Sequence, residues 1–154
     1  MTDRYRANFY VLLQFVLIAL LFLAPRMDQP YGALSPVLSV IGLIFFVIGA
    51  ALLLISFLRL GRSLTASPIP KNDGELVTTG LYARVRHPIY FALLVLSMGV
   101  VLDAGWWPQL IVVVMLYTLL RIKTEFEETL LSRKYRGYKA YAQKTPRFFP
   151  RLTR

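Results

Sequence analysis

The chain has 154 residues, enough for one domain, and it combines 56% hydrophobic residues with a formal net charge of +10. Soluble folds rarely combine high hydrophobicity with high positive charge, whereas a small multi-pass membrane protein with basic cytoplasmic segments does. The basic residues flank apolar runs instead of forming a domain of their own. Nucleic acid is therefore not an expected partner. With no cysteine and a single histidine, the sequence excludes disulfides and thiol chemistry, and no metal site is expected.

Residues 8–25 form the first predicted membrane span, because they are uncharged and about 20 residues of helix cross a bilayer. The apolar run is longer than that of a signal peptide and no A-x-A-like site follows, so we expect the span to be retained. After a turn rich in Pro and Gly, a second span is predicted over 34–58. Gly42 and Gly49 lie seven residues apart in it, on one helix face. They either admit a closely packed neighbouring helix or are merely tolerated there.

A long polar segment, 59–86, follows and contains the turn formers Pro and Asp-Gly. Pro88 suits the first turn of a helix and disfavours helical geometry at the residue before it. We therefore expect His87 to lie at the start of a short third span, 88–102. A turn with two tryptophans, which prefer the membrane interface, leads into a fourth span over 106–121.

From Arg121 the chain is polar and strongly basic. A stripe of leucines and tyrosines at helical spacing predicts that the helix continues out of the membrane, and the C-terminal amphipathic segment 122–154 is expected to lie along the lipid headgroups. Every Lys and Arg except Arg26 lies in the N-terminal segment, the segment 59–86 or this tail. The positive-inside rule then predicts one membrane domain, 1–154, with four spans and both termini cytoplasmic.

Two polar clusters are expected to meet on that cytoplasmic face. One surrounds His87 with two arginines and two tyrosines; the other, 121–128, holds three of the eight acidic residues of the chain. Each alone is typical of a helix end or a solvated helix face with weak ion pairs. Polar groups gathered at a membrane boundary near helix ends together favour a functional site.

The strings LVTTGLYARVRHPIY, EFEETLL, YKAY and TPRFFP resemble the isoprenylcysteine carboxyl methyltransferase family, which is similar in turn to membrane phospholipid N-methyltransferases. The resemblance covers roughly residues 59–152. It implies an integral membrane methyltransferase that uses S-adenosylmethionine, held by the loop 62–90 and the Glu-bearing helix. It assigns cofactor contacts to Leu76, Val77, Tyr82, His87, Pro88, Ile89, Tyr90 and Glu127. It assigns substrate alignment to Lys123, where the family has a basic residue one turn before the glutamate, with Arg121 nearby.

The acceptor is expected to be a lipid or a prenylated small molecule that reaches the site from the bilayer. A carboxylate acceptor is already ionised and needs only cationic alignment, whereas a protonated lipid amine needs a proton acceptor. The surplus of basic groups favours O-methylation of a prenylcysteine-type carboxylate. Phospholipid or amine N-methylation, a sterol-reductase-like enzyme using NADPH, and a non-enzymatic membrane scaffold or small transporter are the alternatives.

Overall fold

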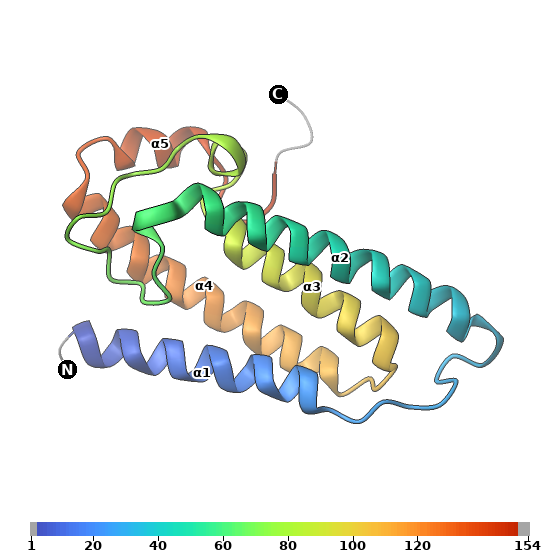
Figure 1. Cartoon of the computed structure of the whole chain (residues 1–154). Helices are drawn as coiled ribbons and strands as arrows, with labels where there is room; N and C mark the ends of the chain where they lie inside the picture. Colours follow the sequence, from blue (N-terminus) through green and yellow to red (C-terminus); the bar gives the residue numbers. More distant parts are fainter. Residues whose placement is uncertain (1–2, 151–154) are drawn as a thin grey trace.

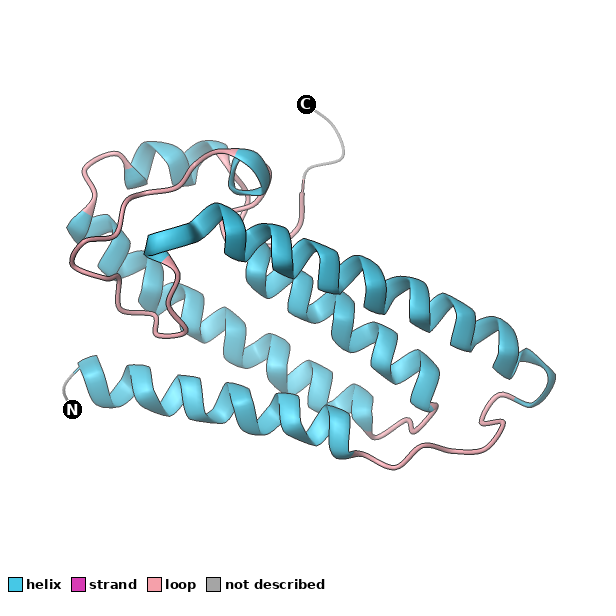
Figure 2. Ribbon diagram, viewed as in Figure 1, coloured by secondary structure: helices cyan, strands magenta, loops and turns pink. Residues whose placement is uncertain are grey.

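The computed structural model describes residues 3–150, and this part of the chain contains helices, turns and loops but no strand (Figure 2). The long helices are α1 (Asp3–Leu23), α2 (Ser35–Leu60), α3 (Pro88–Ala104) and α4 (Gln109–Lys134). A short helix, α5 (Tyr138–Lys144), and three 3-10 turns, η1 (Gly32–Leu34), η2 (Gly61–Ser63) and η3 (Gly80–Ala83), complete it. The all-helical class is confirmed for these residues. Arg151 and Arg154 of the predicted basic tail lie outside them.

The long helices form a bundle in which α2 lies against α3 and α1 lies against α4 (Figure 1). The start of α1, the end of α2, the start of α3 and the end of α4 gather at one end, together with the segment 61–87 and α5. The connections 24–34 and 105–108 lie at the opposite end. The polar segments of the chain are thus brought to one end of the bundle.

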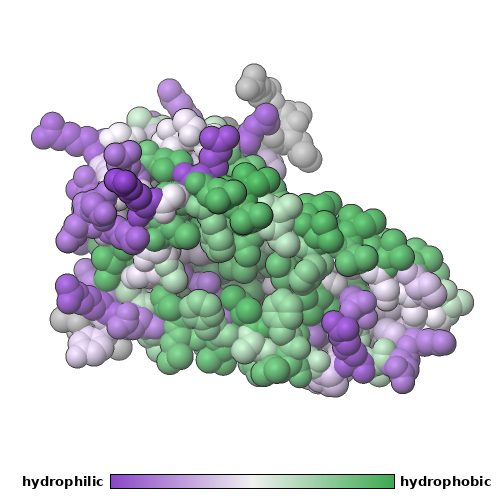
Figure 3. Space-filling view, viewed as in Figure 1, coloured by the Kyte–Doolittle hydropathy of each residue, from purple (hydrophilic) through white to green (hydrophobic). Residues whose placement is uncertain are grey.

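The lateral surface of the bundle is apolar. Asp3–Leu23 and the helical stretch Gly32–Ser63 are each long and apolar enough to cross a membrane, and α3 is a shorter apolar helix. Side chains such as Leu12, Leu43 and Val47 are exposed, and Figure 3 shows hydrophobic surface along the helices with hydrophilic side chains toward the ends. Exposed apolar surface of this extent is typical of contact with lipid.

Three glycines set the spacing between α2 and α3. A Cβ on Gly49 would lie 2.6 Å from the backbone nitrogen of Leu96, and one on Gly42 would lie 2.8 Å from the carbonyl oxygen of Gly99. A Cβ on Gly99 would lie 2.6 Å from the Gly42 carbonyl oxygen in return. The helices therefore approach backbone to backbone, which favours the first of the two interpretations that the sequence left open for Gly42 and Gly49.

α3 begins where the sequence predicts. Pro88 occupies its first turn, and His87 has φ −124° and ψ 65°, outside the helical region, as expected for a residue before proline. The backbone N–H groups of residues 86 and 87 are then available to the C-terminal segment. The Arg86 N–H donates to the Pro146 carbonyl (2.8 Å) and the His87 N–H to the Arg147 carbonyl (3.1 Å). The tail after α5 is thereby tied to the start of α3.

The C-terminal region corrects one prediction. A single helix was expected to run from Arg121 through the tyrosines that follow, but α4 ends at Lys134 and α5 starts at Tyr138. The chain leaves helical geometry at Tyr135 (φ −114°, ψ 116°), whose hydroxyl donates to the Gly74 carbonyl at 2.6 Å. The break turns α5 back over the segment 61–87, so this region covers the end of the bundle.

Candidate functional site

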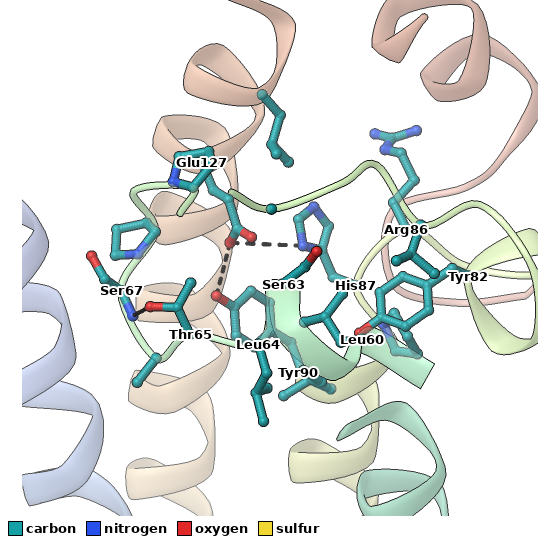
Figure 4. A pocket seen from close by; sticks show the side chains of 18 of the residues that line it. Leu60, Ser63, Leu64, Thr65, Ser67, Tyr82, Arg86, His87, Tyr90 and Glu127 are labelled. Atoms are coloured by element: carbon teal, nitrogen blue, oxygen red, sulfur yellow. Dashed lines mark hydrogen bonds and ion pairs between the residues drawn. The ribbon is translucent and has the colours of Figure 1, made fainter. Parts of the chain in front are cut away.

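A cavity of about 430 Å³ opens at the polar end of the bundle (Figure 4). Its lining comes from α1, α2, α3 and α4, from the segment 63–87, from Tyr135 and from α5. Volumes of this order are typical of small-molecule sites. The cavity joins elements from both halves of the chain, so a ligand in it would contact both polar clusters predicted from the sequence.

Most of the predicted site residues line this one cavity. They are Leu76, Val77, Tyr82, His87, Pro88, Ile89, Tyr90, Lys123 and Glu127. Arg121 is not brought there: its Nη2 lies 3.6 Å from Glu125 Oε1, and its guanidinium carbon lies 6.0 Å from the ring of Phe148. Its side chain is 41% exposed. The expected grouping of two cations beside a substrate is therefore reduced to Lys123.

Glu127 presents its carboxylate to the cavity. Its Oε2 accepts a hydrogen bond from the Tyr90 hydroxyl at 2.8 Å and lies 3.9 Å from His87 Nδ1 (Figure 4). The rings of His87 and Tyr90 stack at 5.4 Å between centroids. Pro88 starts α3 between these two residues, so the local fold of the His-Pro sequence is what turns both rings toward α4. The site thus has one carboxylate flanked by two aromatic side chains.

Glu128, the next residue, points into a different environment. Its Oε1 lies 2.9 Å from Arg86 Nε and 3.0 Å from His87 Nε2, and its Oε2 accepts from Arg147 Nη2 at 2.8 Å. Burial alone would raise the pKa of Glu128, but the hydrogen bonds from His87, Arg147 and Arg86 outweigh it and hold the pKa well below its usual range. Glu128 therefore stays ionised and fixes the loop and the tail to α4.

Arg86, which pairs with Glu128, also binds the C-terminal region. Its Nη1 donates to the carbonyl of Ala142 at 2.7 Å and also to the carbonyl of Thr145. Through these bonds and its ion pair with Glu128, the guanidinium connects α4 to α5 and to the residues that follow α5. Arg86 touches the cavity wall, but these donors are directed away from any ligand in it.

Lys123 is the most deeply buried charged side chain in the described residues, at 1% exposure. Its Nζ donates to Gln14 Oε1 of α1 at 2.6 Å and to the Ala66 carbonyl at 2.9 Å. It also lies 5.3 Å from the centroid of the Tyr90 ring. Burial lowers the pKa of Lys123 and the charge of Glu127 partly offsets this, leaving it at about 8.

Tyrosines close the cavity on the side of α5. The Tyr141 hydroxyl donates to the Tyr82 carbonyl at 2.6 Å. Burial is the main cause that raises the pKa of Tyr82 above its usual range, and it also raises the pKa of Tyr141, to about 12. Both hydroxyls therefore stay protonated at neutral pH. The hydroxyl of Tyr138 is buried and has no hydrogen-bond partner within residues 3–150.

Several lining residues lie outside the predicted site. Among them, Gln14, Tyr135 and Tyr138 belong to the cavity wall. Gln14 carried a signal that could have been used: it is an amide in the middle of an otherwise apolar span, and polar groups at such positions are commonly functional. The turn 63–67 also lines the cavity, within the loop 62–90 that the resemblance assigned to the cofactor, although none of its residues was singled out.

Two known proteins are similar to this chain. The cobalt-zinc-cadmium resistance protein CzcN of Cupriavidus metallidurans is 31% identical over 147 residues, which are 93% of this chain and 62% of that protein. The nickel-cobalt-cadmium resistance protein NccN of Alcaligenes xylosoxydans xylosoxydans is 33% identical over 84 residues, 54% of this chain and 39% of that protein. The chain thus spans less than two thirds of the length of either relative.

The phospholipid methyltransferase family matches residues 37–137. That range is more than half of the chain and contains nearly all of α2, the loop with His87 and the whole of α3 and α4. It includes both Glu127 and Lys123 and most of the wall of the cavity. The match agrees with the resemblance seen in the motifs and with the apolar helices, and this chain belongs to the phospholipid methyltransferase family of membrane proteins.

Proposed function

We propose that this protein transfers a methyl group from S-adenosylmethionine to the head group of a lipid-like acceptor held in the membrane. The observation that carries the proposal is the cavity itself, which has a carboxylate and tyrosines at its polar end and apolar side chains of α1 and α2 further along the bundle. Membership of the phospholipid methyltransferase family supplies the reaction class.

The residues present suit this cofactor. S-Adenosylmethionine offers a methyl carbon bonded to a positively charged sulfur, and that bond breaks with its electron pair left on sulfur when a nucleophile attacks the carbon. Glu127 would hold the ammonium or the ribose hydroxyls, and the rings of Tyr82 and Tyr90 would face the positive charge. The predicted contacts Leu76, Val77, His87, Pro88 and Ile89 would complete the wall.

The apolar part of the cavity supports a lipid-like acceptor. Phe15 and Ile18 of α1 line it together with Leu53 and Phe57 of α2. α1 and α2 pack mainly on different partners, α4 and α3 respectively, and the Phe22 and Phe46 rings meet edge-on between them at 6.5 Å between centroids. An acyl or prenyl chain between them would leave the head group beside Glu127 and Lys123.

The same proposal includes the orientation in the membrane. α1 to α4 would be four spans, with the N-terminus, the segment 61–87 and the C-terminal region on the cytoplasmic side and α5 at the interface. The alternating course of the helices (Figure 1) and the gathering of basic residues at one end support it. A soluble cofactor would then enter from the cytoplasm and an acceptor from the bilayer.

The contribution of the chain to such a reaction is mainly positional. Glu127 and the aromatic wall would fix the donor, while α1 and α2 would fix the acceptor chain, so that the two meet inside a cavity walled on one side by α5 and the loop. Closure excludes water from the reacting groups.

The test uses the full chain reconstituted in vesicles of a total lipid extract, with methyl-labelled S-adenosylmethionine and, in a second arm, an added prenylcysteine analogue. Label in a lipid or in the analogue is expected, and Glu127→Gln should lower it strongly at subsaturating S-adenosylmethionine. Glu125→Gln is the matched control, because Glu125 lies on the same helix but is exposed. Absence of label in every arm, together with a melting temperature that responds to NADPH and not to S-adenosylmethionine, would replace the proposal with a reductase.

A further inference from the structure

The segment that follows α5, residues 145–150, packs behind the polar end of the cavity, and we call it the strap. Its sequence is TPRFFP, and none of its residues lines the cavity. Phe148 is nevertheless 3% exposed and belongs to the apolar core that also contains Tyr90. Methyl transfer as proposed does not use the strap, yet the contacts of the strap converge on residues of the site.

The backbone of the strap holds the start of α3. The carbonyls of Pro146 and Arg147 accept hydrogen bonds from the N–H groups of the two residues before Pro88. One of these two residues is His87, whose side chain makes no capping hydrogen bond to α3. The helix therefore does not fix His87 through a cap, and the strap supplies a backbone hydrogen bond to it instead.

The side chain of Arg147 holds the imidazole of His87 through a carboxylate. Arg147 Nη2 donates to Glu128 Oε2 at 2.8 Å, and Glu128 Oε1 lies 3.0 Å from His87 Nε2. The other ring nitrogen, Nδ1, is then directed toward Glu127, whose Oε2 lies 3.9 Å from it (Figure 4). The strap thus acts on one edge of the imidazole, and the other edge faces the carboxylate of the cavity.

Phe148 packs against the two aromatic rings that flank this carboxylate. Its ring centroid lies 6.1 Å from that of His87 and 6.4 Å from that of Tyr90. From α4, the Tyr117 ring lies 6.1 Å away, and the Arg121 guanidinium carbon lies 6.0 Å from the Phe148 centroid. Arg121, to which the resemblance assigned substrate alignment, therefore contributes to the packing of the strap.

We infer that Phe148 is a positioning residue for the methyl donor, because it holds His87 and Tyr90 where they present the Glu127 carboxylate to the cavity. The inference rests on the proposed binding of S-adenosylmethionine and adds to that site a residue that touches no ligand. The Tyr90 hydroxyl donates the 2.8 Å hydrogen bond that orients the carboxylate. A displacement of the Tyr90 ring is therefore passed to the group that would bind the donor.

Two adjacent phenylalanines in the strap provide matched variants. Phe148→Ala and Phe149→Ala remove the same atoms, but Phe149 is 58% exposed and contacts the ring of Phe91, which does not line the cavity. We expect Phe148→Ala to weaken the affinity for S-adenosylmethionine at least about tenfold, since a misplacement of about 1 Å can cost about 10²-fold. Phe149→Ala should change it by less than about twofold. Calorimetric titration of the full chain in detergent measures both affinities.

A second measurement follows the imidazole itself. His87 is the only histidine of the chain, so ¹⁵N-labelled histidine reports this ring alone, and its nitrogen signals depend on the hydrogen bond at Nε2. In Phe148→Ala the signals should move or broaden, because the ring loses its fixed position beside Glu128; in Phe149→Ala they should coincide with those of the unsubstituted chain. A residue that served stability alone would lower the melting temperature and leave these signals unchanged in the folded protein.

The outcomes separate this inference from the proposed function. Unchanged affinity or unchanged histidine signals in Phe148→Ala, or an equal loss of affinity in both alanine variants, would overturn the role of Phe148 while donor binding stands. If Phe148→Ala does not fold, Phe148→Leu takes its place, and it should still show displaced signals and a lower affinity than the unsubstituted chain; the absence of either counts against the inference. If the unsubstituted chain does not bind S-adenosylmethionine, the proposed function and this inference fail together.

Discussion

Glu127 and Glu128 are adjacent residues with opposite surroundings, and substitution at each should have a different effect. Glu127→Gln keeps the shape of the side chain and its contact with Tyr90 but removes the charge facing the cavity. We expect an S-adenosylmethionine affinity at least tenfold weaker, since a charge-assisted hydrogen bond contributes about 1.5–3 kcal/mol. The melting temperature without ligand should change little. Calorimetric titration of the detergent-solubilised protein measures the affinity for S-adenosylmethionine, and a thermal scan measures the melting temperature.

Glu128 should instead govern stability at acid pH. Its pKa in the folded protein lies below the ordinary value of 4.5, so its contribution is fully present above about pH 4.5 and is lost as the pH falls toward the lowered pKa. Glu128→Gln should therefore lower the melting temperature at pH 7 and flatten its dependence on pH between 3 and 5. Removing one partner of such a cluster costs about 3 kcal/mol. If the melting temperature of the variant fell equally steeply between pH 5 and 3, the loss of stability in acid would be due to other carboxylates.

At this scale the sequence predicted which residues gather but not what each one does. His87, Tyr90 and Glu127 were predicted together, because the His-Pro pair and the acidic helix carry their own local signals. The division of labour between Glu127 and Glu128 was not visible, since it depends on Arg147, which is distant in sequence and reaches Glu128 through the folded tail. The partnership of Lys123 with Gln14 likewise requires α1 to lie against α4.

Among the elements, the pair α2 and α3 depends on the absence of side chains at its contact. Gly99→Ala would place a methyl group 2.6 Å from the Gly42 carbonyl and from the Phe46 nitrogen, both backbone atoms that cannot rotate away. We expect a loss of about 1–3 kcal/mol, as for other overpacked interfaces, measured as a lower unfolding temperature in detergent. Gly137→Ala, with no neighbour within 4 Å, should change stability by less than about 0.5 kcal/mol. Equal effects in the two variants would contradict the close approach.

Helix starts and the glycine face followed from local rules, whereas the end of α4 did not. The stripe of leucines and tyrosines continues past Lys134 without interruption, so periodicity favoured one helix. The break occurs because the Tyr135 hydroxyl and the Lys134 ammonium bind carbonyls of the segment 71–74, a tertiary contact that competes with helical continuation. Gly137, which weakens a helix interior, was the one local sign of it.

For the whole molecule, the arrangement of the helices leads to a prediction about sidedness. The chain has no cysteine, so single cysteines can be introduced without a background. Asn72→Cys in the loop and Lys139→Cys on α5 lie at the end that carries the cavity, and Asp28→Cys lies in the connection at the opposite end. All three positions are exposed.

In sealed inside-out vesicles, a membrane-impermeant maleimide should label the first two positions and leave the third unlabelled until detergent is added. In intact cells the pattern should be reversed. The reason is the distribution of charge: the basic segments that border the cavity resist translocation, while the connections 24–34 and 105–108 carry a single basic residue, Arg26, which lies 3.5 Å from Asp103. Labelling of all three cysteines from one side would show that the helices do not alternate across the bilayer, and a lipid could then not enter the cavity between α1 and α2 from within the membrane.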